Sequence, residues 1–338
     1  MSEKLVKAWY HGHWALMLLA PLAWLYRLIT AVRGFCYRRG WFSVAVFPLP
    51  VIVVGNITVG GTGKTPLTLA LVKHLQAQGF KPAIVSRGYG GQTQYPALVT
   101  ATSQASEVGD EPLFMFQQTQ VPVVVAPKRA QAVARLVQQN NCDVVLCDDG
   151  LQHYALARDM EIVVIDAERG LGNGQLLPQG PLRENKERLT TVDFIVINGK
   201  GSYHCPQSHF DMALEPDDWL MVANTNQGIA PKPPQKVHAV AGIGNPARFF
   251  AALEQQGFQV ITHAFPDHHA FQLSDLTFGD DLPIVMTAKD AVKCVSFPLT
   301  NVWQVPVVAT LSDSFYEQFD QKLAAVRQRK NLITSLIE

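Results

Sequence analysis

The fold is decided by the stretch Val51-Ile-Val-Val-Gly-Asn-Ile-Thr-Val-Gly-Gly-Thr-Gly-Lys-Thr65, in which a short apolar run leads into a glycine-rich loop. The run 51–54 predicts a strand that is buried on both faces. After the loop, apolar residues recur at helical spacing, which predicts a helix over 65–78 that ends at Gly79. A strand, a glycine loop and a helix in this order are typical of a phosphate-binding loop.

The loop has the chemistry that a nucleoside triphosphate needs. Glycines let backbone N–H groups converge on phosphate oxygens, and the helix N-terminus adds partial positive charge. Lys64 is expected to reach the β- and γ-phosphates of ATP, and the Thr65 hydroxyl to bind Mg²⁺. Thr58 stands where such loops usually have their first glycine, so we expect a differently shaped entrance; the alternative is a glycine-rich turn with an incidental lysine. The candidate nucleotide-binding residues are Thr58, Gly60, Gly61, Thr62, Gly63, Lys64 and Thr65.

A second apolar run, 143–147, ends in two carboxylates, Asp148 and Asp149. In phosphate-loop proteins an acid at a strand end holds the Mg²⁺ shell. Two adjacent acids can divide their work between the metal and water or substrate, and the sequence does not say which one touches the metal. The alternative is a strand exit with solvated acids.

Strand and helix patterns alternate through the rest of the chain, which predicts an α/β fold of the phosphate-loop type with a mostly parallel sheet covered on both faces. Three prolines in 230–235 indicate a linker. We therefore expect a kinase-like domain over 41–230 and a smaller α/β domain over 231–338 that closes a cleft. Residues 315–337 predict a long last helix, which could pack back on the first domain. The other predicted elements are strands at 82–86, 121–125, 162–165, 194–197, 237–241, 259–263 and 284–287, and helices at 128–139 and 246–256.

Charge is distributed unevenly. The 338 residues have a formal net charge of +0, yet residues 1–40 contain six basic side chains and one acidic side chain, with four of the six tryptophans at or before position 41. The uncharged run 14–26 is flanked by basic and aromatic residues, which favours a segment at a membrane surface, as a peripheral helix or a single anchor. A buried helix kinked at Pro21 is the alternative. A neutral chain disfavours nucleic acid as a partner, and five scattered cysteines disfavour a disulfide scaffold.

Seven stretches resemble the tetraacyldisaccharide 4′-kinases, also called lipid A 4′-kinases, in which the basic, aromatic N-terminal anchor also has a counterpart. Ala288 departs from the resemblance, since an acidic residue is expected there. The stretches are VGNITVGGTGKTP (54–66), SRGYG (86–90), GDEP (109–112), DDGLQH (148–153), LPQGPLR (177–183), FPDH (265–268) and TAKD (287–290).

The resemblance implies that ATP phosphorylates the 4′-hydroxyl of a tetraacylated glucosamine disaccharide 1-phosphate, giving the lipid IVA precursor of lipopolysaccharide. It also implies Mg²⁺, a lipid substrate and the cytoplasmic face of an inner membrane; no protein partner is predicted.

The resemblance places the acceptor base at Asp110. We expect His268 to tune that carboxylate from the second domain. Glu111 is expected to be a metal-shell or orienting partner, and Arg183 a clamp for phosphate. From the residues alone, 109–112 could instead be a helix N-terminus whose acids offset the helix dipole. His263, Asp267, His268 and His269 could form a metal cluster, and Arg183 could be a surface arginine.

Two other classes of function remain open from the sequence. One is a different phosphate-loop enzyme, such as a soluble small-molecule kinase or an ATP-dependent ligase. The other is a membrane-associated nucleotide switch without catalysis. A ligase or soluble kinase has no need of a lipid-seeking arm, and a switch needs no acceptor base.

Overall fold

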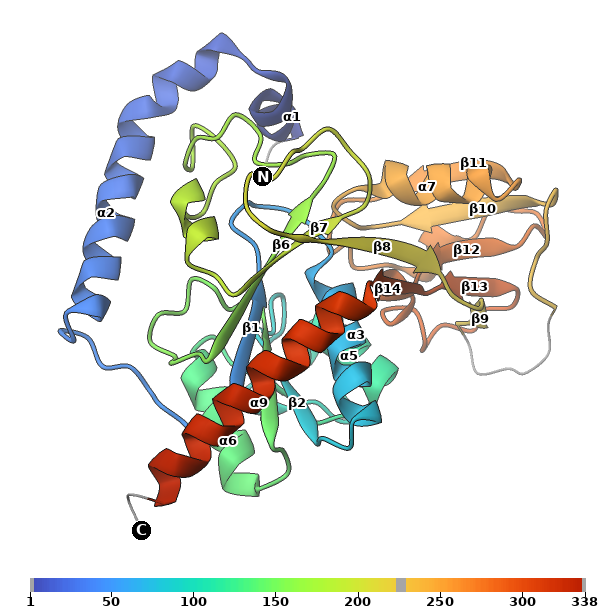
Figure 1. Ribbon diagram of the computed structural model, residues 1–338. Helices are drawn as coiled ribbons and strands as arrows, with labels where there is room; N and C mark the ends of the chain where they lie inside the picture. Colours follow the sequence, from blue (N-terminus) through green and yellow to red (C-terminus); the bar gives the residue numbers. More distant parts are fainter. Residues whose placement is uncertain (1–2, 223–228, 336–338) are drawn as a thin grey trace. The chain divides into compact units, whose positions relative to one another are not determined.

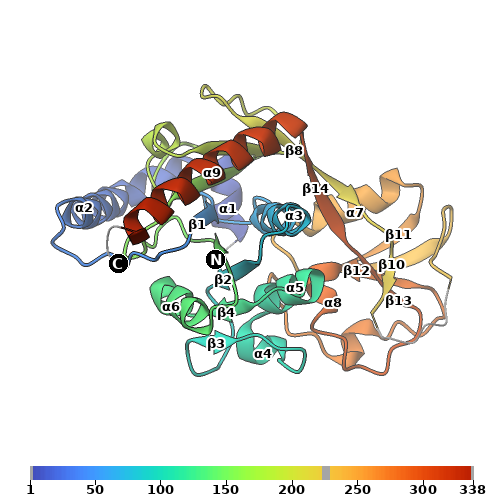
Figure 2. The ribbon, with the colours of Figure 1, turned by 60° about the horizontal axis from the view of Figure 1, so that its bottom comes forward.

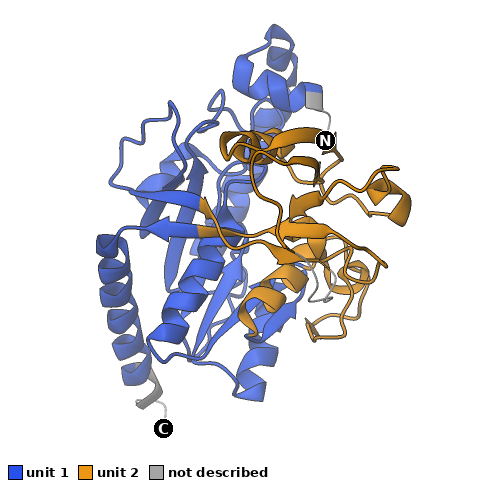
Figure 3. Ribbon diagram, turned by 90° about the vertical axis from the view of Figure 1, so that its right-hand side faces the viewer, with its two compact units in different colours: residues 1–87, 121–214, 309–338 blue, residues 88–120, 215–308 orange. Residues whose placement is uncertain are grey.

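The computed structural model describes residues 3–222 and 229–335, and the chain divides into two compact units (Figure 3). Unit 1 comprises Met1–Arg87, Val121–Leu214 and Ala309–Glu338, and unit 2 comprises Gly88–Gln120 and Glu215–Val308. These bounds differ from the expected domains. Segment 88–120 belongs to unit 2, the N-terminal arm belongs to unit 1, and the expected linker at 230–235 lies inside unit 2.

The sheet of unit 1 is built mainly from parallel strands. Its strands are ordered β14-β8-β7-β6-β1-β5-β2-β4 (Figure 1), and each neighbouring pair from β8 to β4 is parallel. Every residue of β1, β2, β5 and β7 is buried, which explains their uninterrupted apolar sequences. The predicted fold class is confirmed. The bounds are β1 (Val51–Gly55), β2 (Pro82–Ser86), β4 (Val123–Val125), β5 (Val144–Asp148), β6 (Met160–Asp166), β7 (Phe194–Asn198), β8 (Phe210–Pro216) and β14 (Val307–Leu311).

Helices cover both faces of this sheet (Figure 2). The β1–β2 and β4–β5 connections run in opposite directions along the sheet, so right-handed crossovers place α3 (Lys64–Ala77) and α6 (Arg129–Gln139) on opposite faces. The last helix, α9 (Asp313–Ser335), packs beside α3, where His74 Nε2 lies 2.8 Å from Asp320 Oδ1. Residues 336 and 337 of the expected last helix lie outside the described residues. A short 3₁₀ helix, η2 (Lys186–Thr190), follows the loop of Arg183.

The N-terminal arm of unit 1 consists of α1 (Glu3–His11), η1 (Trp14–Leu19) and α2 (Ala20–Arg38). Trp9 fixes it to the unit: this side chain is buried, and its Nε1 donates a hydrogen bond to the Pro178 carbonyl at 3.0 Å. The segment Trp14–Arg38 is 25 residues long and apolar enough to cross a membrane, yet most of it is exposed. The alternative of a buried helix therefore does not describe the arm, and Pro21 lies in the first turn of α2 rather than at a kink.

Unit 2 has its own sheet, ordered β11-β10-β12-β13-β9. All pairs are parallel except β13 with β9. Two apolar clusters pack on the sheet, one around Phe271 and Met286 and the other around Phe250 and Val285. The bounds are β3 (Ala97–Leu98), β9 (Leu220–Met221), β10 (Lys236–Ala241), β11 (Gln259–Ala264), β12 (Ile284–Thr287), β13 (Val302–Val305), α4 (Ala105–Val108), α5 (Asp110–Thr119), α7 (Pro246–Gln255), α8 (Ala288–Ala291) and η3 (Leu273–Leu276).

Candidate functional site

The glycine-rich loop lies at the carboxyl end of β1, where parallel α/β sheets bind their ligands. Gly60 and Gly63 have φ angles of 106° and 95°, in the left-handed region that favours glycine. A Cβ on Gly63 would lie 2.5 Å from the Asn198 side chain, so this position also lacks room for another residue. Gly63 caps α3 without a side-chain hydrogen bond, and the loop therefore presents an uncovered helix N-terminus suited to phosphate.

Thr58, at the entrance of the loop, pairs with the segment that precedes Arg183. It forms an isolated antiparallel bridge with Leu182, and Val59 N donates to the Pro181 carbonyl at 2.9 Å. This pairing gives Thr58 an ordinary backbone without the positive φ that would demand glycine, so a β-branched residue fits. The segment 181–183 is consequently fixed against the loop.

Three charged side chains of unit 1 meet beside the loop. Arg183 Nη1 and Nη2 donate to the Asp149 carboxylate at 2.8 and 3.3 Å, and Lys64 Nζ lies 3.9 Å from Asp149 Oδ1. Burial alone would raise the pKa of Asp149, but the charges of Lys64 and Arg183 hold it at about 2. Asp149 thus carries a full negative charge at neutral pH and orients both cations.

Asp148 differs from its neighbour. It is the last residue of β5, is buried, and pairs in register with Val54 of β1. Its Oδ1 accepts a hydrogen bond from the Thr68 hydroxyl at 3.4 Å. Carboxylate and hydroxyl oxygens are the ligands that Mg²⁺ prefers. The Thr62 hydroxyl within the loop is also buried and has no partner among the described residues, as expected of an atom that faces a ligand. The hydroxyl of Thr65, the second residue of α3, and the Asp148 carboxylate are therefore oxygen donors of the kind that suits Mg²⁺.

Asp110 and His268 form a pair within unit 2. The Nδ1 atom of His268 lies 3.1 and 2.9 Å from the two Asp110 carboxylate oxygens. Burial would raise the pKa of Asp110, but the hydrogen bond with His268 and the charge of Lys289 hold it at about 2. The same hydrogen bond raises the pKa of His268. The sequence analysis placed the two residues on different domains; both belong to one unit.

The local backbone brings this pair together. Asp110 begins α5, as the helix N-terminus interpretation of 109–112 required, and its Oδ1 also accepts from Glu111 N at 2.9 Å. A Cβ on Gly109 would lie 2.7 Å from the Tyr89 carbonyl, so glycine is needed before the helix. His268 has a φ of 61°, and Asp149 one of 51°, in the left-handed region that is rare without glycine. Such strain gathers at functional sites.

Two lysines surround Asp110. Lys293 Nζ lies 3.6 Å from Asp110 Oδ2 and 2.8 Å from Asp290 Oδ1. Lys289 Nζ lies 2.9 Å from Glu111 Oε1 and raises the positive potential around both acids. The Glu111 carboxylate is thus paired with a lysine in this structure. Its expected role as a metal-shell or orienting partner stays a prediction.

Known proteins match this chain over nearly its whole length. The family model described as Tetraacyldisaccharide-1-P 4′-kinase matches residues 15–324. The chain belongs to the tetraacyldisaccharide 4′-kinase family. It is 49% identical over 336 residues to a tetraacyldisaccharide 4′-kinase of Shewanella baltica, covering 98% of both chains. It is 48% identical over 334 residues to that of Hahella chejuensis, covering 96% of this chain and 97% of the relative.

A solved structure agrees with this membership. The crystal structure of LpxK from Aquifex aeolicus in complex with ATP superposes with a TM-score of 0.76 at 26% sequence identity, covering 92% of this chain and 99% of that chain. The likeness therefore extends over the fold of this family member as well as its sequence.

Two asparagines that contact the glycine loop were missed by the sequence analysis. Asn56 Nδ2 donates to the Gly60 carbonyl at 3.2 Å, and its Oδ1 accepts from Arg183 at 2.9 Å. Asn198, the last residue of β7, donates to the Thr62 carbonyl at 3.0 Å. Its position at the carboxyl end of a predicted parallel strand is the signal that could have identified it.

His263 of β11, and His268 and His269 that follow this strand, have separate partners in this kinase-family chain. His263 lies 2.9 Å from the buried His238, His268 binds Asp110, and His269 lies 3.0 Å from Asp275 Oδ2. His269 also packs edge-to-face against Phe271, at 4.9 Å between ring centroids. Within residues 3–222 and 229–335, no group of three such side chains is arranged to hold a metal ion.

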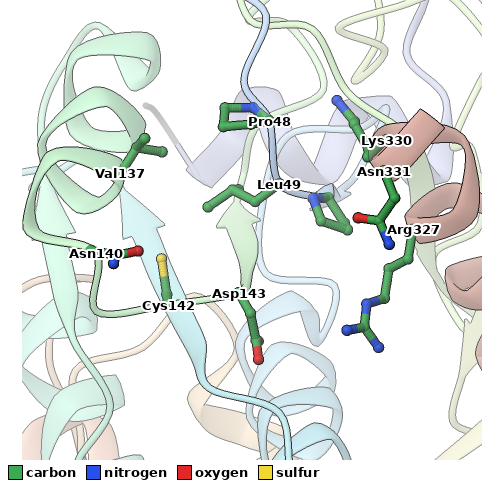
Figure 4. Close-up of a pocket in the computed structure, with 10 residues that line it drawn as sticks. Pro48, Leu49, Val137, Asn140, Cys142, Asp143, Arg327, Lys330 and Asn331 are labelled. Carbon is green, nitrogen blue, oxygen red and sulfur yellow. The ribbon is translucent and has the colours of Figure 1, made fainter. Parts of the chain in front are cut away.

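Two cavities differ in their relation to the chemistry. A cavity of about 650 Å³ in unit 2 is lined by Asp110, His268 and Lys293 among other residues. A smaller one of about 240 Å³ lies in unit 1 at the amino ends of β1 and β5, where Arg327 and Cys142 face it (Figure 4). Parallel sheets bind ligands at their carboxyl ends, so the smaller cavity is separate from the phosphate loop.

Proposed function

We propose that this chain transfers the γ-phosphate of ATP to the 4′-hydroxyl of a tetraacylated glucosamine disaccharide 1-phosphate, the lipid IVA-forming step of lipid A biosynthesis. The observation that carries the proposal is the cluster of Lys64, Asp149 and Arg183 on a glycine loop at the carboxyl end of a parallel sheet. Membership of the tetraacyldisaccharide 4′-kinase family supports this choice of acceptor.

The residues of unit 1 serve the nucleotide. Phosphoryl transfer depends on positioning and on stabilising charge. Lys64 at the start of α3 supplies a cation to the transferring phosphoryl group. Arg183 binds a phosphate oxygen with the guanidinium that Asp149 and Asn56 hold in one orientation.

Magnesium belongs to this proposal as the cation of the nucleotide. Thr65 and Asp148 would hold it, since Asp149 is already engaged by two cations. When bound, the ion neutralises phosphate charge.

Asp110 is proposed as the acceptor of the 4′-hydroxyl proton. Its pKa of about 2 leaves the carboxylate ionised at neutral pH, and therefore able to accept a hydrogen bond from the hydroxyl. His268 holds that carboxylate in one orientation through its Nδ1. The cavity beside Asp110 and His268 is large enough for a sugar ring of the acceptor.

The assay that tests the function uses the full chain with [γ-³²P]ATP, Mg²⁺ and a tetraacylated disaccharide 1-phosphate in mixed micelles. We expect label in a lipid product that carries one more phosphate. Hydrolysis of ATP without labelled lipid would favour the nucleotide-switch alternative. Labelling of a water-soluble sugar acceptor in preference to the lipid would favour the soluble-kinase alternative.

The arm is proposed to lie on the cytoplasmic face of the inner membrane, in the interface rather than across the bilayer. Its apolar side chains are largely solvent-exposed, with Trp14, Leu18 and Trp24 each at least 70% exposed. On the opposite side of α2, the side chains of Tyr26 and Arg33 hydrogen-bond to the backbone carbonyls of Arg183 and Gln152. A helix that crossed the bilayer by itself would lose these hydrogen bonds. Aromatic and basic residues of this kind bind headgroups.

Replacing Trp24 and Leu28 together with serine is expected to weaken binding to anionic vesicles by about ten-fold or more. Each fully buried apolar side chain contributes about 1.5–3 kcal/mol, and these two are exposed in the protein itself. Co-sedimentation with phosphatidylglycerol vesicles measures the change. The matched control replaces Ile229 and Leu273, exposed apolar residues of unit 2, with serine. Equal sedimentation of both variants would contradict the proposal that α2 lies in the membrane interface.

A further inference from the structure

Helix α2 has two faces with different surroundings. Ala23, Tyr26, Thr30, Arg33 and Tyr37 recur at intervals of three and four residues and therefore share one face. The side chains of Tyr26 and Arg33 reach unit 1 from this face. The other side of the helix exposes its apolar residues, among them Trp24 and Leu28.

The contact of Tyr26 is made with the residue that orients the phosphate site. Its hydroxyl donates a hydrogen bond to the backbone carbonyl of Arg183 at 2.9 Å. The backbone N–H of the same residue donates to the Ile57 carbonyl at 2.7 Å, beside the glycine loop. Arg183 is thus held on one side by the nucleotide loop and on the other by the arm, while its guanidinium binds Asp149.

Arg33 makes a parallel connection to the segment that follows Asp149. Its Nη2 donates to the Gln152 carbonyl at 3.3 Å, and its guanidinium lies 5.5 Å from the centroid of the Tyr154 ring. The side chains of Gln152 and Tyr154 both donate to the buried Glu184, at 2.6 and 2.8 Å. Glu184 follows Arg183 directly, so the two loops are tied to each other and to one helix face.

We propose that Tyr26 is a positioning residue for phosphoryl transfer: through its hydrogen bond to Arg183, the lipid-facing helix also fixes the phosphate-binding arginine. Arg33 does the same for the loop of Asp149. The arm is therefore a support of the nucleotide site as well as a contact with lipid. The catalytic part of this inference rests on the proposed kinase function; the structural part does not.

The hydrogen bond from Tyr26 is strong enough to position the Arg183 backbone without being essential for folding. The Tyr26 hydroxyl is partly buried, and burial raises its pKa, so it stays protonated and able to donate. A hydrogen bond of this kind contributes about 0.5–1.5 kcal/mol. That amount is too small to unfold unit 1, yet a small displacement of a positioned group can lower a rate about a hundred-fold.

The test compares Tyr26→Phe with Tyr37→Phe, a matched loss of a hydroxyl from the same helix face. The Tyr37 hydroxyl makes no hydrogen bond among the described residues, and its ring stays beside Tyr154 in the variant. Hydrogen exchange of the full chain on phosphatidylglycerol vesicles is measured over peptides 149–154 and 181–186. We expect faster exchange in both segments for Tyr26→Phe and no change for Tyr37→Phe.

Turnover provides the second measurement. Tyr26→Phe should lower kcat by about five-fold or more, with the KM for lipid and vesicle binding unchanged and the unfolding temperature lowered by only about a few degrees. In an Arg183→Ala background the same substitution should have no further effect on kcat, because it acts through that arginine. Unchanged exchange, a kcat equal to that of Tyr37→Phe, or an undiminished loss in the Arg183→Ala background would each overturn the inference. A wild-type chain that fails to phosphorylate the lipid would instead overturn the proposed function, and hydrogen exchange alone would then decide whether α2 supports the two loops.

Discussion

Replacing Lys64 with alanine is expected to lower kcat by about a hundred- to a thousand-fold, which is the usual loss when a preorganised group that stabilises transition-state charge is removed. Lys64 is the first residue of α3 and lies 3.9 Å from Asp149 Oδ1, within the cluster that also holds Arg183. Because Arg183 remains paired with Asp149 in the variant, the carboxylate keeps a partner. The unfolding temperature should therefore change little.

The matched control for Lys64 is Lys73→Ala, which removes an exposed lysine from the same helix. We expect this variant to keep the kcat of the wild type. Both are measured with [γ-³²P]ATP and saturating lipid acceptor, alongside thermal unfolding. A Lys64→Ala enzyme that turns over like the Lys73→Ala enzyme would remove the phosphate-loop assignment altogether.

The elements of unit 1 could be predicted because each carries its own periodicity. The run 51–54 reads as a buried strand by composition alone, and β1 has these bounds within one residue. β8 was missed, since its alternating and partly exposed residues include Asp211 and Glu215 and form no apolar run. The short β13 and β14 were missed for the related reason that Pro306 separates two brief segments.

The division into units could not be predicted, because it depends on packing between distant segments. Residues 88–120 connect β2 to β4, two strands of unit 1. Within this segment, however, α5 packs against α8 of unit 2. No change of composition marks the boundaries of this segment, at 87/88 and 120/121. The proline-rich segment 230–235, which suggested a boundary, is a surface turn within unit 2.

The site residues could be predicted where they follow the end of an apolar strand. They could not be predicted where their position depends on backbone conformation or on packing between distant segments. Asp148 and Asp149 follow an apolar run and were identified on that ground. The left-handed backbone of Asp149, which accompanies its contact with Lys64 and Arg183, has no signal in the sequence. The link from Tyr26 to Arg183 spans 157 positions and depends entirely on the packing of the arm.

Asp110 and His268 give the second large expected effect. Replacing Asp110 with asparagine should lower kcat by about a hundred- to ten-thousand-fold, because the amide keeps the shape of the carboxylate but loses its capacity to take a proton. The KM for ATP should change little, since the phosphate loop belongs to the other unit. His268→Ala should lower kcat by a smaller factor, because it removes the hydrogen bond that orients the carboxylate without removing the base.

The control for this pair is chemically matched. His238 Nε2 lies 3.1 Å from Asp280 Oδ1 in the same unit, and neither residue lines the cavity beside Asp110. The substitutions Asp280→Asn and His238→Ala should lower the unfolding temperature, because His238 is buried and stacks on Phe278, while leaving kcat near that of the wild type.

The double-mutant cycle decides whether Asp110 and His268 act as one unit. If His268 acts only by orienting the Asp110 carboxylate, it has nothing left to orient once that carboxylate is gone. The double variant should then have about the kcat of Asp110→Asn alone, a strong departure from additivity. If Asp110 only begins α5 and His268 only packs against the Tyr89 ring, both substitutions should reduce stability, spare kcat and combine additively. Additive losses in kcat would therefore refute the pair even if lipid phosphorylation itself is observed.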